Sequence, residues 1–404
     1  MGNNMQWLRK GLGAVPQSYN RNLHSGSGLS KLPVFVGILA IAAQVIAPVR
    51  ARVVQRGTPV AGHPTSGAIF PYVLVEFAKT AAGKPQPMVL SPSGRVIVTT
   101  RGKILAARAG TVGGFTRTAG IQEGINYAVA TGADLYIEGR SAIGRTNNNV
   151  YFVHAPITIP ATQDFRIDGG ESVINYSPPR GDLLTIDSCE DCHYRFGLLV
   201  TGARGGCAVR FRPLHPTPID GITVITDSSF RFSSIATAGS ALPPSLRGPS
   251  VSAPLAGLFF DARHGPILFN RVYATAIISY QDNILLAGIS PSHAVLANTI
   301  RVAHIHAAAK AEVKLNRYSN RNIFHLTAAT DGQPGSGVIT AGSYNIFFLD
   351  CFGFPRGRDM VLEPGGKGNI IISARPISFT NRSDSPNELI QGTTGAELLG
   401  GGRP

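Results

Sequence analysis

Three residues in the segment DSCEDCHYRFG, at positions 187–197, have the spacing of a cofactor-binding motif. Cys189, Cys192 and His193 form Cys-x-x-Cys-His, the pattern by which c-type haem is attached to a protein. Haem attachment uses a helical turn, whereas this segment lies between LLTID and YRFGLLV, which are both typical of strands. We therefore predict a corner at 188–191 and no bound cofactor.

Period-two alternation orients the side chains around this corner. In an extended chain Cys189 and Cys192 point to opposite faces, and a buried Cys192 packs as a small apolar residue. Cys207 on the following strand is expected to face inward, as a neighbour or disulfide partner of Cys192. These three cysteines lack a clear fourth zinc ligand, so no metal site is predicted. The side expected to hold Cys192 also carries Tyr194, Phe196, Leu198 and Val200, and the opposite side carries His193 and Arg195.

Carboxylates at strand ends are the candidates for acid–base chemistry on a glycan. The strands LLTID, ITVITD and GLFFD end in Asp187, Asp227 and Asp261. If these ends stack along one edge, the carboxylates could lie close enough to act together. The alternative is that aspartate simply ends strands and forms turns.

A Pro/Gly-rich segment at 354–368 interrupts the strand pattern. It contains Arg356, Arg358, Asp359 and Glu363, whose donors and acceptors suit a polar ligand such as a sugar acid. The alternative is a solvated loop without a ligand.

Composition indicates which elements must hold these residues. The 404 residues include 47 Gly and 28 Pro, with 43% hydrophobic and 15% charged residues, a balance that favours many short strands and tight turns. The net charge of +14 is concentrated near the N-terminus: residues 1–120 hold 14 Lys/Arg and one acid, Glu76. Such asymmetry indicates an acidic partner. No compact basic run with interleaved aromatic residues is present, so specific nucleic-acid binding is not predicted.

The first 114 residues are predicted to form a small basic N-terminal domain or anchor that docks the chain to a larger assembly. Its apolar run at 32–49 is either a signal or membrane anchor or a buried element. The alternating pattern at 86–106 around a Ser-Gly turn predicts a β-hairpin.

A repeat of 23–24 residues organises the second half. The strands NTIRVA, NIFHLT, NIFFLD and NIIISA begin at Asn298, Asn322, Asn345 and Asn369. A period in the twenties predicts a solenoid, and the asparagines are expected at a corner, where Asn tolerates left-handed backbone and hydrogen-bonds to the next turn. The inward columns are predicted to be Ile300, Phe324, Phe347 and Ile371, then Val302, Leu326, Leu349 and Ser373.

The outward columns of the same strands become apolar toward the C-terminus. Ile346, Phe348, Ile370 and Ile372 all face outward in this pattern. A solvated face does not normally do this, so these residues are predicted to contact a partner copy in an oligomer. The alternative is that the last 25 residues of the chain cover them.

The segments GIQEGINYAVATG, ADLYIEG and APITIPATQDFRIDGGESVINY resemble the entry of pectate-lyase-like β-helix proteins, a group that includes polysaccharide lyases, glycoside hydrolases and bacteriophage tailspikes. The resemblance implies an all-β, right-handed parallel β-helix over 115–380. A capping helix at 120–132 would open it, and a Gly-rich tail would follow at 381–404. It also favours a homotrimer.

Two functions follow from this reading. The first is a structural or adhesive tailspike-type protein, located on a virion or at the cell surface, that presents a face for a glycan or receptor. The second is a secreted or membrane-anchored polysaccharide lyase or glycoside hydrolase. Because no recognisable catalytic set is present, the non-enzymatic function is the one predicted.

Overall fold

The fold is that of a computed structural model, which describes residues 117–137, 150–237, 254–328, 335–350, 354 and 358–391. For five N-terminal strands, only the backbone pairing is described: β1 (Tyr72–Lys79), β2 (Pro85–Leu90), β3 (Val96–Val98), β4 (Ile104–Ala106) and β5 (Gly110–Val112).

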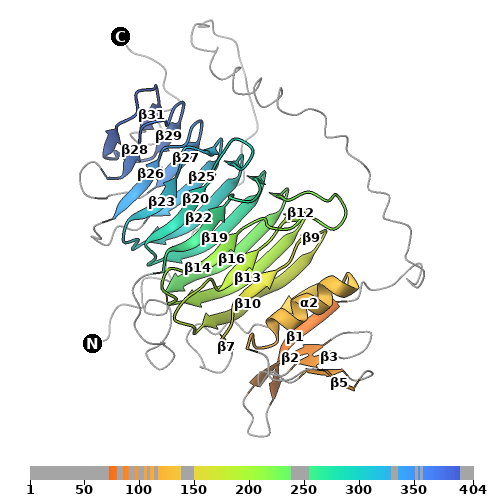
Figure 1. Ribbon diagram of the computed structural model, residues 1–404. Coiled ribbons are helices and arrows are strands. Elements are labelled where there is room, and N and C mark those ends of the chain that lie inside the picture. The colour runs from red at the N-terminus through yellow and green to blue at the C-terminus, as the bar shows by residue number, and fades with distance from the viewer. Residues whose placement is uncertain are drawn as a thin grey trace, which may run out of the picture. The chain divides into compact units, whose positions relative to one another are not determined.

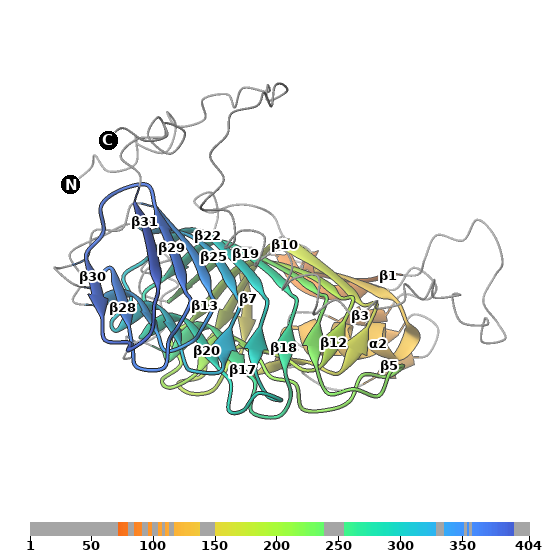
Figure 2. The same cartoon turned by 90° about the horizontal axis from the view of Figure 1, so that it is seen from above.

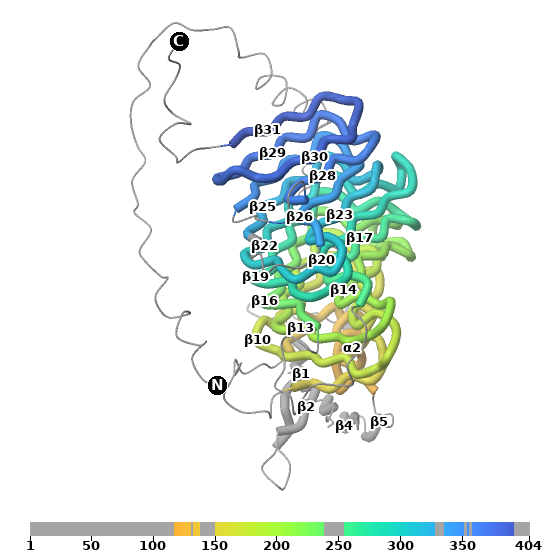
Figure 3. Tube along the Cα trace, turned by 90° about the vertical axis from the view of Figure 1, so that its left-hand side faces the viewer, coloured from red at the N-terminus to blue at the C-terminus, as the bar shows by residue number. Residues whose placement is uncertain are grey.

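Three parallel sheets wind into a β-helix (Figures 1 and 3). The long sheet contains, in spatial order, β2, β1, β6 (Asp134–Ile137), β10 (Arg166–Tyr176), β13 (His193–Thr201), β16 (Ser229–Thr237), β19 (Arg271–Ile278), β22 (Thr299–His306), β25 (Ile323–Ala328), β27 (Ile346–Asp350), β29 (Ile370–Ser373) and β31 (Glu388–Gln391), with β7 (Val150–Val153) also paired to β10.

The two remaining sheets of the β-helix form its other faces (Figure 2). The second sheet contains β8 (Ile157–Ile159), β11 (Leu184–Ile186), β14 (Cys207–Phe211), β17 (Ala256–Asp261), β20 (Asp282–Ala287), β23 (Ala311–Leu315), β26 (Ser336–Thr340), β28 (Met360–Leu362) and β30 (Phe379–Asn381). The short-strand sheet contains β9 (Thr162–Gln163), β12 (Cys189–Glu190), β15 (Ile225–Thr226), β18 (Ile267–Leu268), β21 (Val295–Leu296) and β24 (Ser319–Asn320).

Each coil visits the sheets in turn, as β9, β10 and β11 do before β12 returns to the short-strand sheet. Apart from the β1–β2 pair, every pairing in these three sheets is parallel, and parallel strands are joined by right-handed crossovers. The predicted all-β, right-handed parallel β-helix is therefore confirmed.

The interior is the continuous apolar column that the repeat predicted. Register pairs Ile300 with Phe324, Phe324 with Phe347, and Phe347 with Ile371, and all four side chains are fully buried. The Phe324 and Phe347 rings stack with their centroids 5.0 Å apart. The second predicted column is also buried, from Val302 through Leu326 and Leu349 to Ser373.

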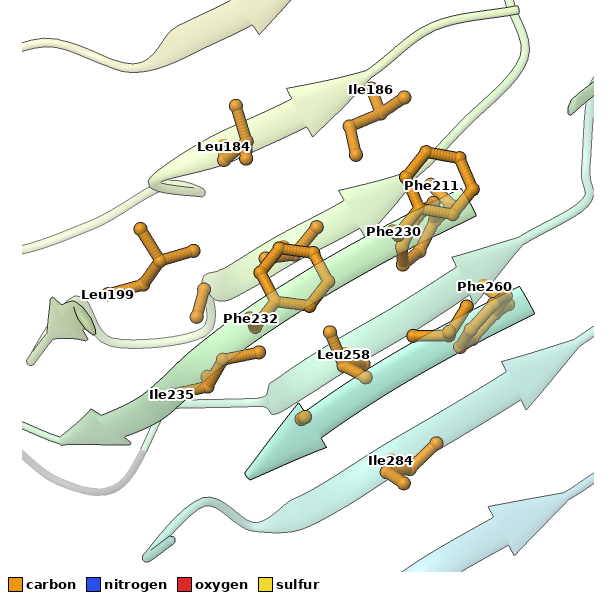
Figure 4. Packing of buried hydrophobic residues seen from close by; sticks show 14 of the residues in the cluster. Leu184, Ile186, Leu199, Phe211, Phe230, Phe232, Ile235, Leu258, Phe260 and Ile284 are labelled. Atoms are coloured by element: carbon orange, nitrogen blue, oxygen red, sulfur yellow. The ribbon is translucent and has the colours of Figure 1, made fainter. Parts of the chain in front are cut away.

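Aromatic rings fill the earlier coils in the same way (Figure 4). Phe211 lies between Phe230, at 4.9 Å in an edge-to-face arrangement, and Phe260, stacked at 4.6 Å. Such pairs contribute about 0.5–1.5 kcal/mol each beyond the burial of their area. The core of each coil is therefore locked to the next by side-chain contact as well as by the strand ladders.

A buried asparagine ladder forms the corner before the long sheet. The Nδ2 group of Asn298 donates to Oδ1 of Asn322 at 3.1 Å, and Asn322 donates in turn to Asn345 at 3.2 Å. Each amide also donates to a main-chain carbonyl in the preceding coil, as Asn322 does to Val295. The hydrogen bonding predicted for this corner is confirmed. The complete ladder is Asn270, Asn298, Asn322, Asn345, Asn369 and Asn387.

The left-handed backbone predicted for these asparagines falls one residue earlier. Ala297, Arg321 and Tyr344 have φ values of 56°, 56° and 59°, whereas no ladder asparagine has positive φ. The turn residue bends the chain inward, and the asparagine that follows is thereby buried with its amide along the coil axis. This part of the prediction was wrong by one position.

The short helix α2 (Ile121–Thr131) lies within the predicted range 120–132 and covers the first coil (Figure 1). Its inward-facing residues Ile121, Ile125 and Ala128 are fully buried. Glycines with left-handed backbone bound both ends, Gly120 with φ 84° and Gly132 with φ 64°, which suits a residue without Cβ.

Two other predicted boundaries differ from the structure. The coils continue through β31 to Gln391, past the predicted end at 380, because Asn387 and ELIQ repeat the corner-and-strand pattern only 18 residues after Asn369. The hairpin expected at 86–106 is divided, since β2 pairs with β1 over six residues and β3 pairs with β4.

The apolar segment 32–49 lies outside the described residues. Across the described part of the chain, no helix combines the length and apolar character needed to cross a membrane.

The corner predicted at 188–191 is confirmed only at Asp191, because Cys189–Glu190 is strand β12. Asp191 has φ 53°, and Cys192 occupies the ladder position: its backbone N–H donates to Ser228 Oγ at 3.0 Å. Both Cys189 and Cys192 are free and fully buried in the core, so the prediction of opposite faces was wrong. The bend at Asp191 reverses the alternation and turns both thiols inward. Burial raises the pKa of Cys189 well above its usual value, so this thiol is neutral.

The alternation also changes phase within β13. Tyr194 and Phe196 face the core as predicted, but Leu199 follows them there instead of Leu198. Leu198 and Val200 belong to a separate apolar cluster outside the core. This break lies next to a bulge in β10, where the register with β13 shifts between Gly169 and Val173, and it is repeated in β16, where Phe232 and Ile235 face the core.

Cys207 does not face the other cysteines. It is buried with Ala256 and Phe259 in a cluster apart from the core, and its Sγ lies 3.6 Å from a guanidinium nitrogen of Arg210. The expectation of an inward Cys207 beside Cys192 was therefore wrong. Among the described residues, no group of three or more His, Cys, Asp or Glu side chains could hold a metal ion.

Replacing Gly197 with alanine is expected to destabilise the β-helix by about 1–3 kcal/mol. A Cβ at this position would collide with the backbone of Ser172 in the bulge, although the φ of Gly197 is ordinary. Gly170→Ala is the matched control, because the new methyl group would meet only the movable Arg195 side chain. Denaturant unfolding compares the two, and equal stabilities would show that the bulge tolerates a side chain.

Candidate ligand-binding surface

A groove of about 800 Å³ lies on the outer face of the long sheet, over β10, β13, β16 and β19. Its size is within the range of small-molecule and oligosaccharide sites. We call it the arginine groove. The arginine, histidine and aspartate residues that line it are Arg166, Asp168, His193, Arg195, Arg231 and Arg271.

Strand register arranges the outward side chains into two rows. The first row is Arg166, His193, Ser229, Arg271, Thr299, Ile323, Ile346, Ile370 and Glu388. The second row is Asp168, Arg195, Arg231, Tyr273, Arg301, His325, Phe348, Ile372 and Ile390. Neighbours in a row are one strand spacing apart, about 4.8 Å. The face is therefore basic over its first five coils and mainly apolar beyond them, with His325 and Glu388 as the exceptions.

Arg195 lies across the backbone of β10, over Gly170. A Cβ at Gly170 would occupy the space of the Arg195 guanidinium, so the absence of a side chain there lets the arginine lie flat. Its Nη1 lies 3.7 Å from the Asp168 carboxylate, and the Arg195 side chain is 56% exposed. An exposed ion pair of this length holds the arginine only weakly.

Arg231 and Arg271 are exposed lining residues of the groove, on β16 and β19. Neither guanidinium group forms an ion pair or hydrogen bond with any residue that the structure describes. Both guanidinium groups therefore keep all their donors for solvent or a ligand. Tyr273 lies between Arg231 and Arg301 in the register, with 38% of its surface exposed.

The residues predicted as an oligomer interface lie on the same face, past the basic coils. Ile346, Ile370 and Ile372 are partly buried, and Phe348 is 36% exposed. The ring of His325 stacks on that of Phe348 with 4.4 Å between centroids. The outward orientation expected for these four residues is thus observed, and their contact with a partner stays a prediction.

The three aspartates proposed for catalysis do not form one cluster. Asp187 and Asp261 end strands of the second sheet with Arg212 between them in register, whereas Asp227 is a left-handed corner residue beside the short-strand sheet. Asp187 is buried and accepts hydrogen bonds from the backbone of Leu214 at 2.5 Å and from the His215 ring at 2.5 Å. These contacts support the turn-forming alternative, and catalysis by any of the three stays a prediction.

Asp261 is the centre of an ion-pair network. Arg263 binds it through two nitrogens, each at 2.7 Å, and Arg210 joins it to Asp182 with contacts of 3.0 and 2.7 Å. Burial raises the pKa of Asp261, but the hydrogen bonds from Arg263 and Arg210 outweigh this and hold it below its ordinary value. The group is therefore an ionised anchor and a poor proton donor.

The ligand-binding candidates of the 354–368 segment differ in the contacts that they make. Asp359 is buried and accepts 2.6 Å hydrogen bonds from the backbone and hydroxyl of Ser378, so it holds the turn together. Glu363 pairs with Arg382 at 3.1 Å. Arg358 is exposed, and Arg356 lies outside the described residues. Ligand binding by this segment stays a prediction.

A carboxyl cluster at the short-strand sheet has an unusual titration. Burial, followed by a hydrogen bond with Asp220, raises the pKa of Glu190 to about 7. The Nε2 group of Gln163 bridges the two carboxyls, 3.0 Å from Glu190 and 2.6 Å from Asp220. Asp191 and Asp227 add further negative charge nearby.

Glu190 should make the protein less stable as the pH rises. Its pKa is higher in the folded chain than its ordinary 4.5, so its stabilising contribution is complete below about pH 4.5 and is lost as the pH approaches 7. Glu190→Gln, which imitates the protonated form, should reduce the pH dependence of the unfolding midpoint between pH 4.5 and 8. Glu171→Gln, at an exposed position, is the control, and identical pH profiles for the two variants would contradict the assignment.

The arginine groove was not predicted from the sequence. The sequence pattern that marks the groove is an arginine between two inward-facing residues, as in FRI, YRF and FRF at Arg166, Arg195 and Arg231. The strands β10, β13, β16 and β19 start 27, 36 and 42 residues apart, because long excursions separate the coils, so no fixed period aligned them. The regular 23–24-residue repeat drew attention to the apolar coils instead.

Comparison with known proteins adds one structural match. A scan against family models and a search of curated proteins each found no match. Among solved structures, the chain is similar to the Dettilon tailspike protein, with 12% sequence identity and a TM-score of 0.21. The match covers 70% of this chain and 66% of the tailspike chain, which is just under two thirds of that protein's length. The fold assignment therefore depends on the strand pairing described above.

Proposed function

We propose that this protein is a tailspike-type β-helix that binds a glycan on the outer face of its long sheet. The observation that carries the proposal is the arginine groove, a hollow lined by charged and polar side chains from four successive strands of a regular face. The outward positions of each coil lie about 4.8 Å from the corresponding positions of the preceding coil. A surface that repeats in this way suits a polymer of repeating units better than a single small molecule.

The basic N-terminal region is proposed to dock the chain onto a larger assembly, on a virion or at a cell surface. Its support is the charge asymmetry, with 14 Lys/Arg against one acid in residues 1–120. Basic regions of this kind associate with acidic surfaces.

The apolar half of the long sheet is proposed to contact identical copies, in the trimer that the sequence resemblance favours. Ile346, Phe348, Ile370 and Ile372 form two adjacent outward rows there. A second copy of the same face would remove these side chains from water.

Blocking the groove tests the glycan proposal. Thr275 is exposed in the groove beside Ser233, and Thr275→Trp should fill part of the groove and lower affinity for any glycan bound there at least tenfold. Ser292→Trp, on an exposed loop, is the matched control. Binding of the full chain to a panel of immobilised polysaccharides gives the affinities, and assay for released sugar in the same samples detects cleavage. A glycan that binds both variants equally would overturn the assignment of the groove.

A further inference from the structure

We infer that the arginine groove selects an acidic polysaccharide, one that carries carboxylate or sulfate groups along a hydroxyl-rich chain. This inference rests on the proposed function and specifies the chemical class of its ligand.

The charge of the groove requires a counter-charge. Four arginines line it, and Asp168 is the single acid among its lining residues. That carboxylate is on β10, the first strand of the groove, and lies beside Arg195. Arg231 and Arg271 are therefore left with no acidic partner in the described structure. A neutral glycan would leave both guanidinium groups without an ionic partner, whereas an anionic one would neutralise them.

The arginines are placed to bind several anionic groups in succession. Arg166, Arg195, Arg231 and Arg271 come from four consecutive strands of the long sheet, so they extend over about 14 Å along the coil axis. Arg301 extends the second row by one more strand. A guanidinium binds carboxylate or sulfate through two parallel hydrogen bonds, so the groove can bind anions carried by neighbouring units of one polymer.

Neutral polar groups lie among the arginines. Ser229, Ser233 and Thr275 contribute hydroxyls to the lining. The hydroxyls of Ser229 and Thr275 can both donate to and accept from sugar hydroxyls, whereas Ser233 donates to the Gly170 carbonyl and can accept. Single-stranded nucleic acid is bound chiefly by stacking bases on aromatic rings. Tyr273 is the one exposed aromatic side chain among the lining residues that the structure describes. This composition favours an acidic polysaccharide over nucleic acid.

The test uses matched pairs of probes with the full-length chain. Hyaluronan is compared with its methyl ester, and dextran sulfate with dextran, so that each pair has the same sugar chain with and without its anionic groups. Oligo(dT) is the non-glycan polyanion. We expect at least one acidic probe to bind at least tenfold more tightly than its neutral partner, with affinity falling as NaCl is raised. The two pairs also distinguish carboxylate from sulfate recognition.

Arginine variants connect that binding to the groove. Arg231→Gln and Arg271→Gln should each weaken the acidic probe about tenfold, since hydrogen bonds to charged groups are among the stronger ones. Arg204→Gln, at an exposed position outside the groove, should leave affinity unchanged. Thermal unfolding of each variant confirms that the fold is intact.

Three results would overturn the inference. If the neutral probe binds as tightly as its acidic partner and Thr275→Trp abolishes that binding, the glycan function stands and the acidic class fails. If no acidic probe binds more tightly than its neutral partner, the inference also fails. If oligo(dT) binds as tightly as the acidic glycans, with the same dependence on Arg231 and Arg271, the groove is a nucleic-acid site. Glycan binding that is unaffected by Thr275→Trp would overturn the proposed function itself.

Discussion

Asn322→Ala is expected to lower the free energy of unfolding by about 4 kcal/mol. The Asn322 side chain makes four hydrogen bonds inside the β-helix, two of them from Asn298 and one each to Val295 and Asn345. Truncation leaves the Asn298 N–H and the Val295 carbonyl buried with fewer partners. Each buried polar group left unsatisfied costs about 1–3 kcal/mol, and the loss falls in the middle of the ladder.

Two variants show whether the ladder causes the effect. Asn126→Ala removes an exposed amide that bonds only to Gln122 on α2, and it should change stability by less than about 0.5 kcal/mol. Asn322→Asp keeps the shape but replaces the donor, so an oxygen faces the Asn345 oxygen in a buried site. Asn322→Asp should lower the free energy of unfolding at least as much as Asn322→Ala does. Denaturant unfolding measures all three, and an unchanged midpoint for Asn322→Ala would mean that the ladder contributes little.

Phe347→Ala is expected to cost about 3–5 kcal/mol, because it removes a fully buried ring that stacks on Phe324. Phe348→Ala is its natural control. The two residues are neighbours in β27, yet Phe348 faces outward and is 36% exposed. Phe348→Ala should change the free energy of unfolding of the isolated chain by less than about 1 kcal/mol.

The same pair tests the proposed oligomer. If the apolar rows contact identical copies, Phe348→Ala should shift the protein toward monomer in analytical ultracentrifugation while its coils stay folded. Wild-type protein that sediments only as monomer would overturn the proposed interface. An unchanged assembly in Phe348→Ala would place the contact elsewhere.

The regular coils could be predicted because two periods agree there. Alternation along each strand fixed which residues of NIFHLT and NIFFLD face the core, and the 23–24-residue spacing fixed which of them stack. Phe324 and Phe347 were paired correctly for that reason. Neither period holds where the backbone departs from a regular strand. The break in alternation at Gly197 and the left-handed turn at Asp191 each reverse the facing of the residues beside them, so Leu198 and Cys189 were placed on the wrong side.

The groove could not be predicted from the same patterns. Its arginines occupy corresponding positions only after strands separated by unequal excursions are brought into register, and that register is a property of the folded coils. The aspartates drew attention because strand ends are easily seen in a sequence. Their roles depend on partners such as His215 and Arg263, and no local pattern identifies those partners.

The asparagine ladder also gives the β-helix an electrical direction. Every ladder oxygen accepts from the coil on its N-terminal side, whereas the first five amides donate both to the next asparagine and to a carbonyl of the preceding coil. The six side-chain carbonyl dipoles therefore add along the axis instead of cancelling. Sheets ordinarily have little net dipole. The positive end falls at Asn387, whose amide is bound by the oxygens of Ser383 and Ser385 at 2.8 and 2.9 Å. This corner is thus a counterpart of the α-helix macrodipole, and its last donor is capped as a helix terminus would be.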